Sequence, residues 1–350
     1  MAHLSILVVS YNTRRETLAC LRSVFAATLA CPREVIVVDN ASSDGSCEAI
    51  DDEFPDAQLI GLRRNVGFAR ANNIAAKRAN GDMLLLLNPD TVVTGEAVES
   101  LLRFAARHRD AGIWGGRTVF PDGTLNPSSC WRFMSLPSVL SQAVGLSALF
   151  RTSGVFNREA YGGWARDSMR EVDIVTGCFL LIRRQTWEDL GGFDERFFMY
   201  AEEADLCYRA RARGCRPMFT PEASIVHIGG ASETVFAPKC IRLFSAKATF
   251  MNKHWPGWRS KLGVAILKLH VLSRHAGHFA LGRLAGSPRH GDRAREWRNV
   301  WRARTQWERG YPPSGDVPLP GGSHEAHRSL AVPGPAGTGR GAAEERADHD

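Results

Sequence analysis

Short apolar runs alternate with helix-like segments over the first hundred residues of the chain. Residues 4–9, 34–38 and 83–87 are runs bounded by polar or turn residues, as expected of strands buried on both faces. The segments between them carry apolar residues at helical spacing, namely Leu18, Leu21, Val24 and Phe25, then Ala71, Ile74, Ala75 and Ala79. This alternation predicts βαβ units, and therefore an α/β, Rossmann-like fold with a mostly parallel sheet flanked by helices.

A polar cluster follows each of these three predicted strands directly. The clusters are Ser10-Tyr11-Asn12, residues 39–44 beginning with Asp39-Asn40, and Asn88-Pro89-Asp90. Open α/β sheets bind ligands at the carboxyl ends of their strands, so the clusters predict a site at one edge of the sheet. No G-x-G-x-x-G or G-x-x-x-x-G-K-[ST] sequence follows the first strand. A nucleotide at this edge would therefore be held by side chains and a metal.

Two aspartates in these clusters are candidates for donor and metal binding. Asp90 follows the most apolar strand, where a carboxylate can hold Mg²⁺ or Mn²⁺ together with phosphate oxygens, although Asn-Pro-Asp alone is more often a simple turn. Asp39 can accept hydrogen bonds from a base N–H or a ribose hydroxyl. Residues 42–44 are also good helix caps, and capping is compatible with binding.

Residues 65–73 place polar groups before and within a predicted helix start. Asn65 precedes Gly67, which allows close backbone approach, and Phe68 and Asn72 follow. The N-terminus of such a helix favours a diphosphate. An ordinary loop-to-helix junction explains the same stretch equally well.

The second half of the chain is less regular. Residues 111–171 are rich in Gly, Pro, Trp and Arg and give no clear assignment, whereas residues 172–183 predict one or two strands around Thr176-Gly177-Cys178. A short helix is expected over residues 185–190 and another over residues 203–213, with Gly214 after it.

Three acids stand at the start of the second of these helices. Glu202, Glu203 and Asp205 gain stability from the helix dipole, which is a structural explanation for them. Crowded carboxylates also raise the pKa of at least one member, which suits a general base. His227, at the end of a predicted strand, is either a plain core or loop residue or a metal ligand.

In their order and spacing, these segments resemble the family 2 glycosyltransferases, especially the bacterial rhamnosyltransferase-like branch. The resemblance covers about residues 1–255 and is carried by residues 8–12, 37–44, 65–73, 87–90, 176–178, 192–200 and 202–209. It implies a GT-A fold with C-terminal amphipathic, basic helices added.

The resemblance also implies roles for particular residues. Asp39 corresponds to the aspartate that contacts uracil or thymine, Asp90 to the last acid of the metal-binding D-x-D motif, and Glu203 to the catalytic base. His227 matches a histidine that completes the metal shell in some members. Asn88 replaces the first Asp of D-x-D, and Glu203 stands where Asp is commoner. The other expected donor-side residues are Ser10, Tyr11, Asn12, Asn40, Asn65, Phe68, Asn72 and Asn88; those expected at the acceptor or in support are Thr176, Gly177, Glu202, Asp205 and Arg209, the last pairing with Asp205 one turn away.

The implied activity is an inverting transfer from a dTDP- or UDP-linked sugar, with Mg²⁺ or Mn²⁺, to a hydroxyl of a glycan or lipid-linked acceptor. Rhamnose is the first choice, with galactofuranose, glucose or N-acetylglucosamine as alternatives. A non-catalytic sugar-binding relative and another sugar-nucleotide enzyme remain as rival functions. Processive synthesis is disfavoured because no Q-x-x-R-W motif and no apolar run of about 18 residues is present.

Charge sets the C-terminal region apart from the rest of the chain. The chain carries +7, but residues 234–310 hold 16 Lys and Arg against three acids, or +13, which leaves −6 elsewhere. Helical patterns run over residues 239–255, 261–283 and 293–309. This basic region is either a contact with an anionic membrane or a helical cover with a solvated cationic face, and nucleic-acid binding ranks last.

These patterns give a domain prediction and a location. We expect a catalytic domain at residues 1–233, with a nucleotide-sugar half to about residue 110 and an acceptor half after it. The basic region at 234–310 and a disordered tail at 311–350 follow. Eight scattered cysteines without a C-x-x-C pair, and a strand that begins at Leu4, favour a cytoplasmic enzyme, with a peripheral contact on the inner membrane face as an option.

Overall fold

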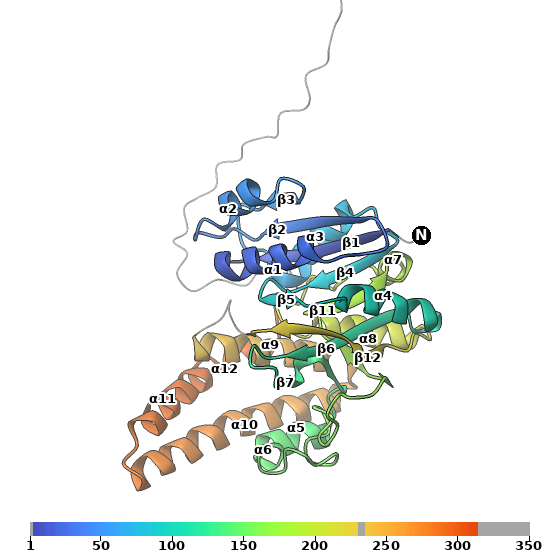
Figure 1. The fold of residues 1–350 in the computed structure, drawn as a ribbon. Coiled ribbons are helices and arrows are strands. Elements are labelled where there is room, and N and C mark those ends of the chain that lie inside the picture. The colour runs from blue at the N-terminus through green and yellow to red at the C-terminus, as the bar shows by residue number, and fades with distance from the viewer. Residues whose placement is uncertain (1–2, 230–234, 314–350) are drawn as a thin grey trace, which may run out of the picture. The chain divides into compact units, whose positions relative to one another are not determined.

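The first half of the described chain forms a parallel sheet. The computed structural model describes residues 3–229 and 235–313; the predicted tail from residue 314 onward lies outside the described residues. Strands β1 (Leu4–Ser10), β2 (Arg33–Asp39), β3 (Gln58–Gly61) and β4 (Met83–Leu87) pair in the order β3-β2-β1-β4, all parallel. Helices α1 (Arg14–Ala26), α2 (Ser46–Glu53) and α3 (Phe68–Arg78) connect them (Figure 1). The predicted βαβ pattern is confirmed.

The second half extends the same sheet with mixed strand directions. β11 (Phe179–Arg183) runs antiparallel to both β4 and β6 (Ile113–Val119), while β12 (Met218–His227) is parallel to β6 and antiparallel to β5 (Thr91–Val93). The full order is β3-β2-β1-β4-β11-β6-β12-β5. The shorter elements of this half are β7 (Leu125–Asn126), β8 (Cys130–Trp131), β9 (Arg170–Glu171), β10 (Ile174–Val175), α4 (Ala97–Arg107), α5 (Leu136–Ala143), α6 (Leu146–Leu149) and the 3₁₀ turns Arg109–Ala111 and Pro127–Ser129.

Strand β6 lies in the region that the sequence left unassigned. Its two central glycines, Gly115 and Gly116, are poor strand formers, so they hide the strand in the sequence. A Cβ on Gly116 would stand 2.4 Å from the carbonyl oxygen of Ala223 in β12 and 2.4 Å from the ring of Phe179 in β11. The missing side chain therefore allows three strands to approach closely.

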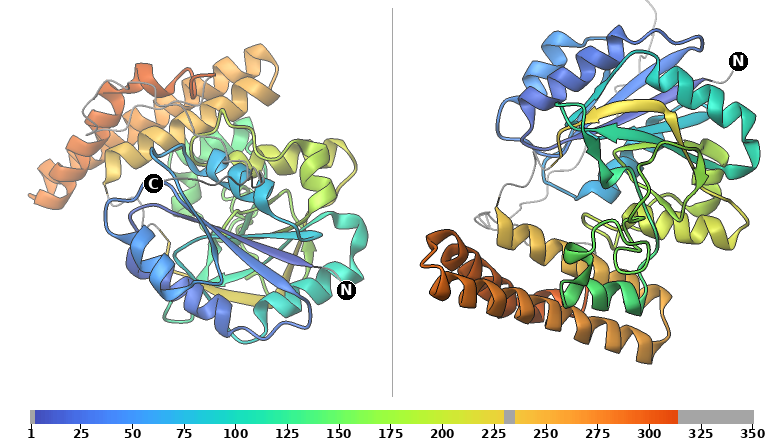
Figure 2. Two further views of the ribbon diagram at one scale, coloured as in Figure 1. Left: turned by 90° about the horizontal axis from the view of Figure 1, so that it is seen from above. Right: turned by 60° about the horizontal axis from the view of Figure 1, so that its bottom comes forward.

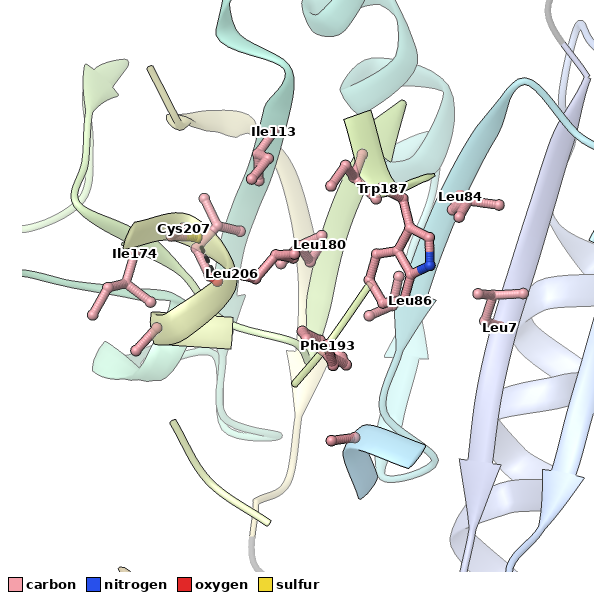
Figure 3. Close-up of a cluster of buried hydrophobic side chains, with 14 of the residues drawn as sticks. Leu7, Leu84, Leu86, Ile113, Ile174, Leu180, Trp187, Phe193, Leu206 and Cys207 are labelled. Carbon is pink, nitrogen blue, oxygen red and sulfur yellow. Dashed lines mark hydrogen bonds between the residues drawn. The ribbon is translucent and has the colours of Figure 1, made fainter. Parts of the chain in front are cut away.

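Helices cover both faces of the sheet (Figure 2). Alternate residues of the buried strands point to opposite faces, so Leu4, Ile6 and Val8 pack in one cluster with α1 and α4. Leu7 packs in the other cluster, where Leu84, Leu86 and Leu180 meet Trp187 and Phe193 (Figure 3). Helices α7 (Arg184–Leu190) and α8 (Glu202–Ala212) cover this second face. Their bounds agree closely with the helices predicted over residues 185–190 and 203–213.

Four helices follow the sheet. They are α9 (Phe236–His254), α10 (Gly257–Leu284), α11 (Pro288–Arg302) and α12 (Arg304–Trp307). The helix predicted over residues 239–255 is confirmed, and Phe244, Ala248, Met251 and Trp255 are all buried. Tyr311, after α12, is also buried, and its hydroxyl donates to the carbonyl oxygen of Met199 at 2.8 Å. This bond connects the C-terminal helices to the loop before α8.

Two chemical features accompany this fold. All eight cysteines are free thiols, and burial raises the pKa of both Cys20 and Cys207 to about 12, so these two are unreactive at neutral pH. Across residues 3–229 and 235–313, no helix has the length and apolar character needed to cross a bilayer.

Candidate active site

A cavity of about 820 Å³ opens where the predicted strand ends converge. The sequence-predicted residues that line it are Tyr11, Asn40, Asn65, Phe68, Asn88, Asp90, Thr176, Gly177, Glu202, Glu203 and His227. They come from the ends of strands β1, β2, β4 and β12 and from the starts of helices α3 and α8. The structure therefore brings residues more than two hundred positions apart into one chamber, and its volume is in the range of small-molecule sites.

Other predicted site residues lie just outside the cavity wall. Ser10 is buried, with its hydroxyl 3.1 Å from that of Thr17. Asn12 accepts the backbone N–H of Ser43 at 2.8 Å, and Asn72 donates to the carbonyl oxygen of Phe68 at 2.9 Å. These contacts hold the strand ends and the start of α3 in place.

Asp39 ends strand β2 and is also buried. Its Oδ1 accepts the backbone N–H of Ser42 at 2.9 Å. Its Oδ2 is buried and has no hydrogen-bond partner among the described residues. An unpaired buried acceptor costs free energy, so this oxygen is suited to a ligand that brings a donor.

Hydrogen bonds between two asparagines shape the loop before α3. The Asn40 side chain donates to Asn65 Oδ1 at 2.9 Å and accepts the backbone N–H of Val66 at 2.9 Å. Gly67 has φ = +85°, and a Cβ there would stand 2.4 Å from the carbonyl oxygen of Phe198. The glycine thus allows the segment leading into α8 to lie directly against the start of α3.

Asp90 and His227 are brought together by strand register. His227 pairs with Thr91 in the antiparallel ladder between β12 and β5, which places its imidazole beside Asp90. Nε2 of His227 lies 3.3 Å from Asp90 Oδ1, and both side chains are buried. Burial alone would lower the pKa of His227, but the neighbouring Cys178 thiol and the Asp90 carboxylate raise it to about 10.

This pair is the part of the cavity wall that could hold a divalent ion. One carboxylate and one imidazole are suitable ligands for Mn²⁺ or Mg²⁺ when substrate phosphate oxygens fill most of the shell. An ion that binds here must displace the proton that His227 otherwise carries at neutral pH. Nowhere in the described part of the chain do three or more His, Cys, Asp or Glu residues gather with metal-binding geometry. The donor set therefore fits an ion shared with a diphosphate rather than one caged by protein.

Glu202 and Glu203 enter the cavity from a strained turn. Tyr200 and Ala201, directly before α8, have φ values of +71° and +63°, a left-handed backbone that is unfavourable for side chains with a Cβ. Oε2 of each glutamate is buried and has no hydrogen-bond partner among the described residues. Burial raises the pKa of Glu203 to about 7, against the opposing effect of backbone N–H groups, and burial and the Glu203 charge raise the pKa of Glu202.

Asp205, two residues after Glu203, has three basic side chains as partners. Its carboxylate lies 2.7 Å from Arg209 Nε, 2.5 Å from Lys253 Nζ and 2.7 Å from His254 Nε2. Burial works to raise the pKa of Asp205, but these hydrogen bonds and charges lower it. The predicted ion pair between Asp205 and Arg209 is thus present, and this carboxylate is engaged in joining α8 to α9.

Comparison with known proteins decides the family. The sequence profile described as glycosyl transferase family 2 matches residues 5–190, more than half of the chain. The chain belongs to this family. The resemblance expected from the motifs is therefore confirmed, and the protein is a glycosyltransferase.

Relatives and solved structures agree with this assignment. The N-acetylglucosaminyl-diphospho-decaprenol L-rhamnosyltransferase of Mycobacterium tuberculosis is 27% identical over 77% of this chain and 93% of its own length. The rhamnosyltransferase WbbL of Escherichia coli is 27% identical over 53% of this chain and 69% of its own. The mannosyltransferase PcManGT of Pyrobaculum calidifontis, solved with GDP-Man and Mn²⁺, is 17% identical, with a TM-score of 0.53 over 87% of this chain and 86% of that one. The expected GT-A fold is confirmed.

The glycosyltransferase cavity has a second end that the sequence did not predict. Trp131, Phe133 and Met134 line it with the polar side chains of Gln142, Glu159 and Lys247. Lys247 Nζ lies 3.0 Å from Gln142 Oε1, and the Gln142 side chain donates to Glu159 at 2.8 Å. Most of these residues lie within residues 111–171, for which no clear assignment was possible from the sequence. The one sequence feature that could have indicated this end of the cavity was Lys247, which stands between two alanines of the apolar helix α9.

Proposed function

We propose that this glycosyltransferase inverts the anomeric centre as it moves a hexose from a nucleoside-diphosphate sugar to a hydroxyl of a lipid-linked or glycan acceptor. One observation carries the proposal: a single cavity holds the unpartnered carboxylate of Glu203 and the Asp90–His227 pair. The similarity to the mycobacterial rhamnosyltransferase over most of its length supports rhamnose, from a dTDP- or UDP-linked donor, as the first choice.

Glu203 acts as the general base on the acceptor side. With a pKa of about 7 it is substantially ionised at neutral pH and still basic enough to take a proton. The acceptor oxygen forms a bond to the anomeric carbon as the bond to the diphosphate oxygen breaks. The proton passes to Glu203, and the electron pair leaves with the diphosphate. Attack from the face opposite the leaving group inverts the configuration.

Residues at the opposite end of the chamber hold the donor. Tyr11, Asn40 and Phe68 line this part of the cavity, and the buried Oδ2 of Asp39, directly before Asn40 and outside the lining, is assigned to the base or ribose. The N-terminus of α3, which follows Asn65 and Gly67, carries the positive end of the helix dipole and would favour the negatively charged diphosphate. These contacts orient the donor with its anomeric carbon toward Glu203.

Asp90 and His227 would hold a divalent ion on the diphosphate. Such an ion neutralises charge that develops on the departing diphosphate. The Mn²⁺ in the similarly folded mannosyltransferase supports this assignment, as does the donor set of the two side chains. Asn88 lies beside them in the wall and supplies a neutral oxygen where the family's usual motif has a carboxylate.

Release of nucleoside diphosphate tests the proposal directly. The purified chain is incubated with dTDP-, UDP- and GDP-sugars and a membrane extract as acceptor source, with Mn²⁺ or Mg²⁺ and then with EDTA. Turnover of one donor should be lost with EDTA and in Asp90→Ala. Asp56→Asn, an exposed aspartate after α2, serves as the matched control and should keep full turnover.

Two outcomes would change the conclusion. Donor binding by calorimetry without turnover of any sugar would favour the non-catalytic, sugar-binding alternative. Turnover that persists in EDTA and in Asp90→Ala would retain the glycosyltransferase and remove the metal from its mechanism. Product anomeric configuration, read by NMR against the donor, decides whether the transfer inverts.

A further inference from the structure

Helix α10 has an apolar side that the described protein does not cover. On one side, Ile266, Leu267 and Val271 are buried in the cluster that joins the C-terminal helices. On the opposite side, exposed apolar residues recur at intervals of four, seven, three and seven, and therefore fall on a single face. We call this face the α10 stripe, and its residues are Trp258, Leu262, Leu269, Leu272 and Phe279.

The exposure of these side chains is high for a helix that is already buried along its other side. Trp258 is 68% exposed and Leu269 is 42% exposed, although the same helix already contributes a full buried face. A soluble helix of a globular protein normally carries polar residues opposite its buried face. A continuous exposed apolar face marks an interaction surface.

More exposed apolar residues lie on the segment beside α10. Helix α5 packs against it, with Ser273 donating to the carbonyl oxygen of Ala143 at 2.5 Å and Arg274 to that of Gln142 at 3.1 Å. The turn that continues from α5 through α6 exposes Leu149 and Val155. Exposed apolar residues therefore also occur on the segment that follows the helix packed against α10.

Charge on α10 identifies the kind of partner. Over its 28 residues the helix contains no Asp or Glu. Its cations are Arg259, Lys261, Lys268, Arg274 and Arg283, of which Lys268 is paired with Glu308 and Arg274 with the Gln142 carbonyl oxygen. Lys261 is exposed next to Leu262, and the Arg283 guanidinium lies 5.2 Å from the ring centre of Phe279. Cations that flank an apolar stripe complement a surface with acidic headgroups above an apolar layer.

We propose that the α10 stripe docks on an anionic lipid bilayer, with the helix lying in the plane of the interface. A second copy of the chain fits the stripe less well, because pairing two such helices brings cations against cations. The proposal goes beyond the proposed reaction, since docking needs neither donor nor metal.

Docking of this kind also places the cavity with respect to the membrane. Gln142, whose carbonyl oxygen accepts the bond from Arg274, carries a side chain in the cavity wall. One residue of α5 therefore touches both the docking helix and the chamber. An acceptor anchored in the bilayer would enter at the end of the cavity formed by α5 and α9.

Vesicle co-sedimentation of the full chain tests the proposal. Vesicles of phosphatidylcholine alone are compared with vesicles that also contain phosphatidylglycerol. Leu269→Gln should weaken binding to the anionic vesicles about tenfold, since a leucine that enters the interface is replaced by a polar side chain. Leu281→Gln is the matched control: it is 49% exposed on the same helix but stands two residues past Phe279, off the stripe. Its binding should stay within about twofold of the unmodified chain.

Charge and self-association complete the test. Lys261→Glu should reduce binding to phosphatidylglycerol vesicles and should not change the thermal unfolding midpoint. The proposal is overturned if the unmodified chain ignores anionic vesicles, or if Leu269→Gln and Leu281→Gln bind equally well. A dimer seen by light scattering that Leu269→Gln dissociates, without vesicle binding, would assign the stripe to a second copy instead.

Discussion

Two kinds of carboxylate environment share the first turn of α8. Glu202 and Glu203 each present a buried oxygen without a hydrogen-bond partner among the described residues, and burial raises the pKa of both. Asp205, two residues on, contacts Arg209, Lys253 and His254, and its pKa is lowered. Sequence position and helix dipole are almost the same for all three carboxylates, so neither explains why the pKa is raised in two of them and lowered in the third.

The difference arises from what packs against each side of the turn. Lys253 and His254, at the end of α9, lie over Asp205, whereas Glu203 faces the cavity. A carboxylate that is paired on every side contributes to folding, and one that is buried without partners is held ready for a proton. The comparison predicts opposite consequences for substitutions two residues apart.

The largest effect is expected on turnover. Glu203→Gln keeps the shape of the side chain but cannot accept a proton, so kcat should fall about a thousandfold while donor affinity changes little. The fall in kcat is measured from single-turnover and steady-state rates with the donor that the nucleoside diphosphate release assay selects. Glu188→Gln, an exposed glutamate on α7, is the matched control. A loss of less than about tenfold would remove Glu203 from the role of base.

The next effect is on stability. Asp205→Asn leaves Lys253 and the Arg209 guanidinium facing a neutral amide in a buried site, and the free energy of unfolding should fall by about 3 kcal/mol. Urea unfolding followed by tryptophan fluorescence measures the change. Asp52→Asn, on the exposed side of α2, should change the free energy of unfolding by less than about 0.5 kcal/mol. Equal midpoints for the two variants would show that the cluster around Asp205 is not structural.

Local spacing predicted part of this arrangement. The ion pair between Asp205 and Arg209 follows from residues four apart on a helix, and it is present at 2.7 Å. Lys253 and His254 could not be assigned to the cluster from sequence, because their contact depends on how α9 packs on α8. The sequence interpretation also allowed the cations of α9 to face solvent, yet Lys247 and Lys253 point toward carboxylates inside the protein.

The fold, like the carboxylate cluster, could be predicted from the sequence only in part. Apolar runs and strand-end polar clusters identified β1, β2 and β4 and the cavity-lining residues at their ends, since side chains at the ends of parallel strands must share one edge. Asp90 and His227 were expected at one metal site through the family resemblance alone, because the register of β12 against β5 that joins them is not visible in the sequence. The same limit applies to α10, where periodicity shows an apolar helix but not which of its faces is covered.

A third prediction also concerns stability, but here the substitution should stabilise the protein, whereas Asp205→Asn should destabilise it. Burial raises the pKa of Glu203 from 4.5 to about 7, so the folded protein binds that proton more tightly than the unfolded chain does. The resulting stability is complete below pH 4.5 and is lost as the pH rises through 7. Glu203→Gln should therefore be more stable than the unmodified protein at pH 8, by about 3 kcal/mol. The gap should close at about pH 4, and a variant less stable than the unmodified protein at pH 8 would contradict the assigned environment.

The smallest expected effect is on the pH dependence of kcat. It tests whether burial or a neighbouring charge raises the pKa of Glu203. A base must be deprotonated to act, so kcat should rise about tenfold between pH 6 and pH 8, with its midpoint near the Glu203 pKa of about 7. Burial, rather than the Glu202 charge, is the main cause of that pKa. Glu202→Gln should therefore keep the midpoint near pH 7, and Asp205→Asn should do so as well in whatever fraction folds. A midpoint that moves toward pH 5 in Glu202→Gln would instead show that the two glutamates share one proton, and the proton acceptor would then be the pair rather than Glu203 alone.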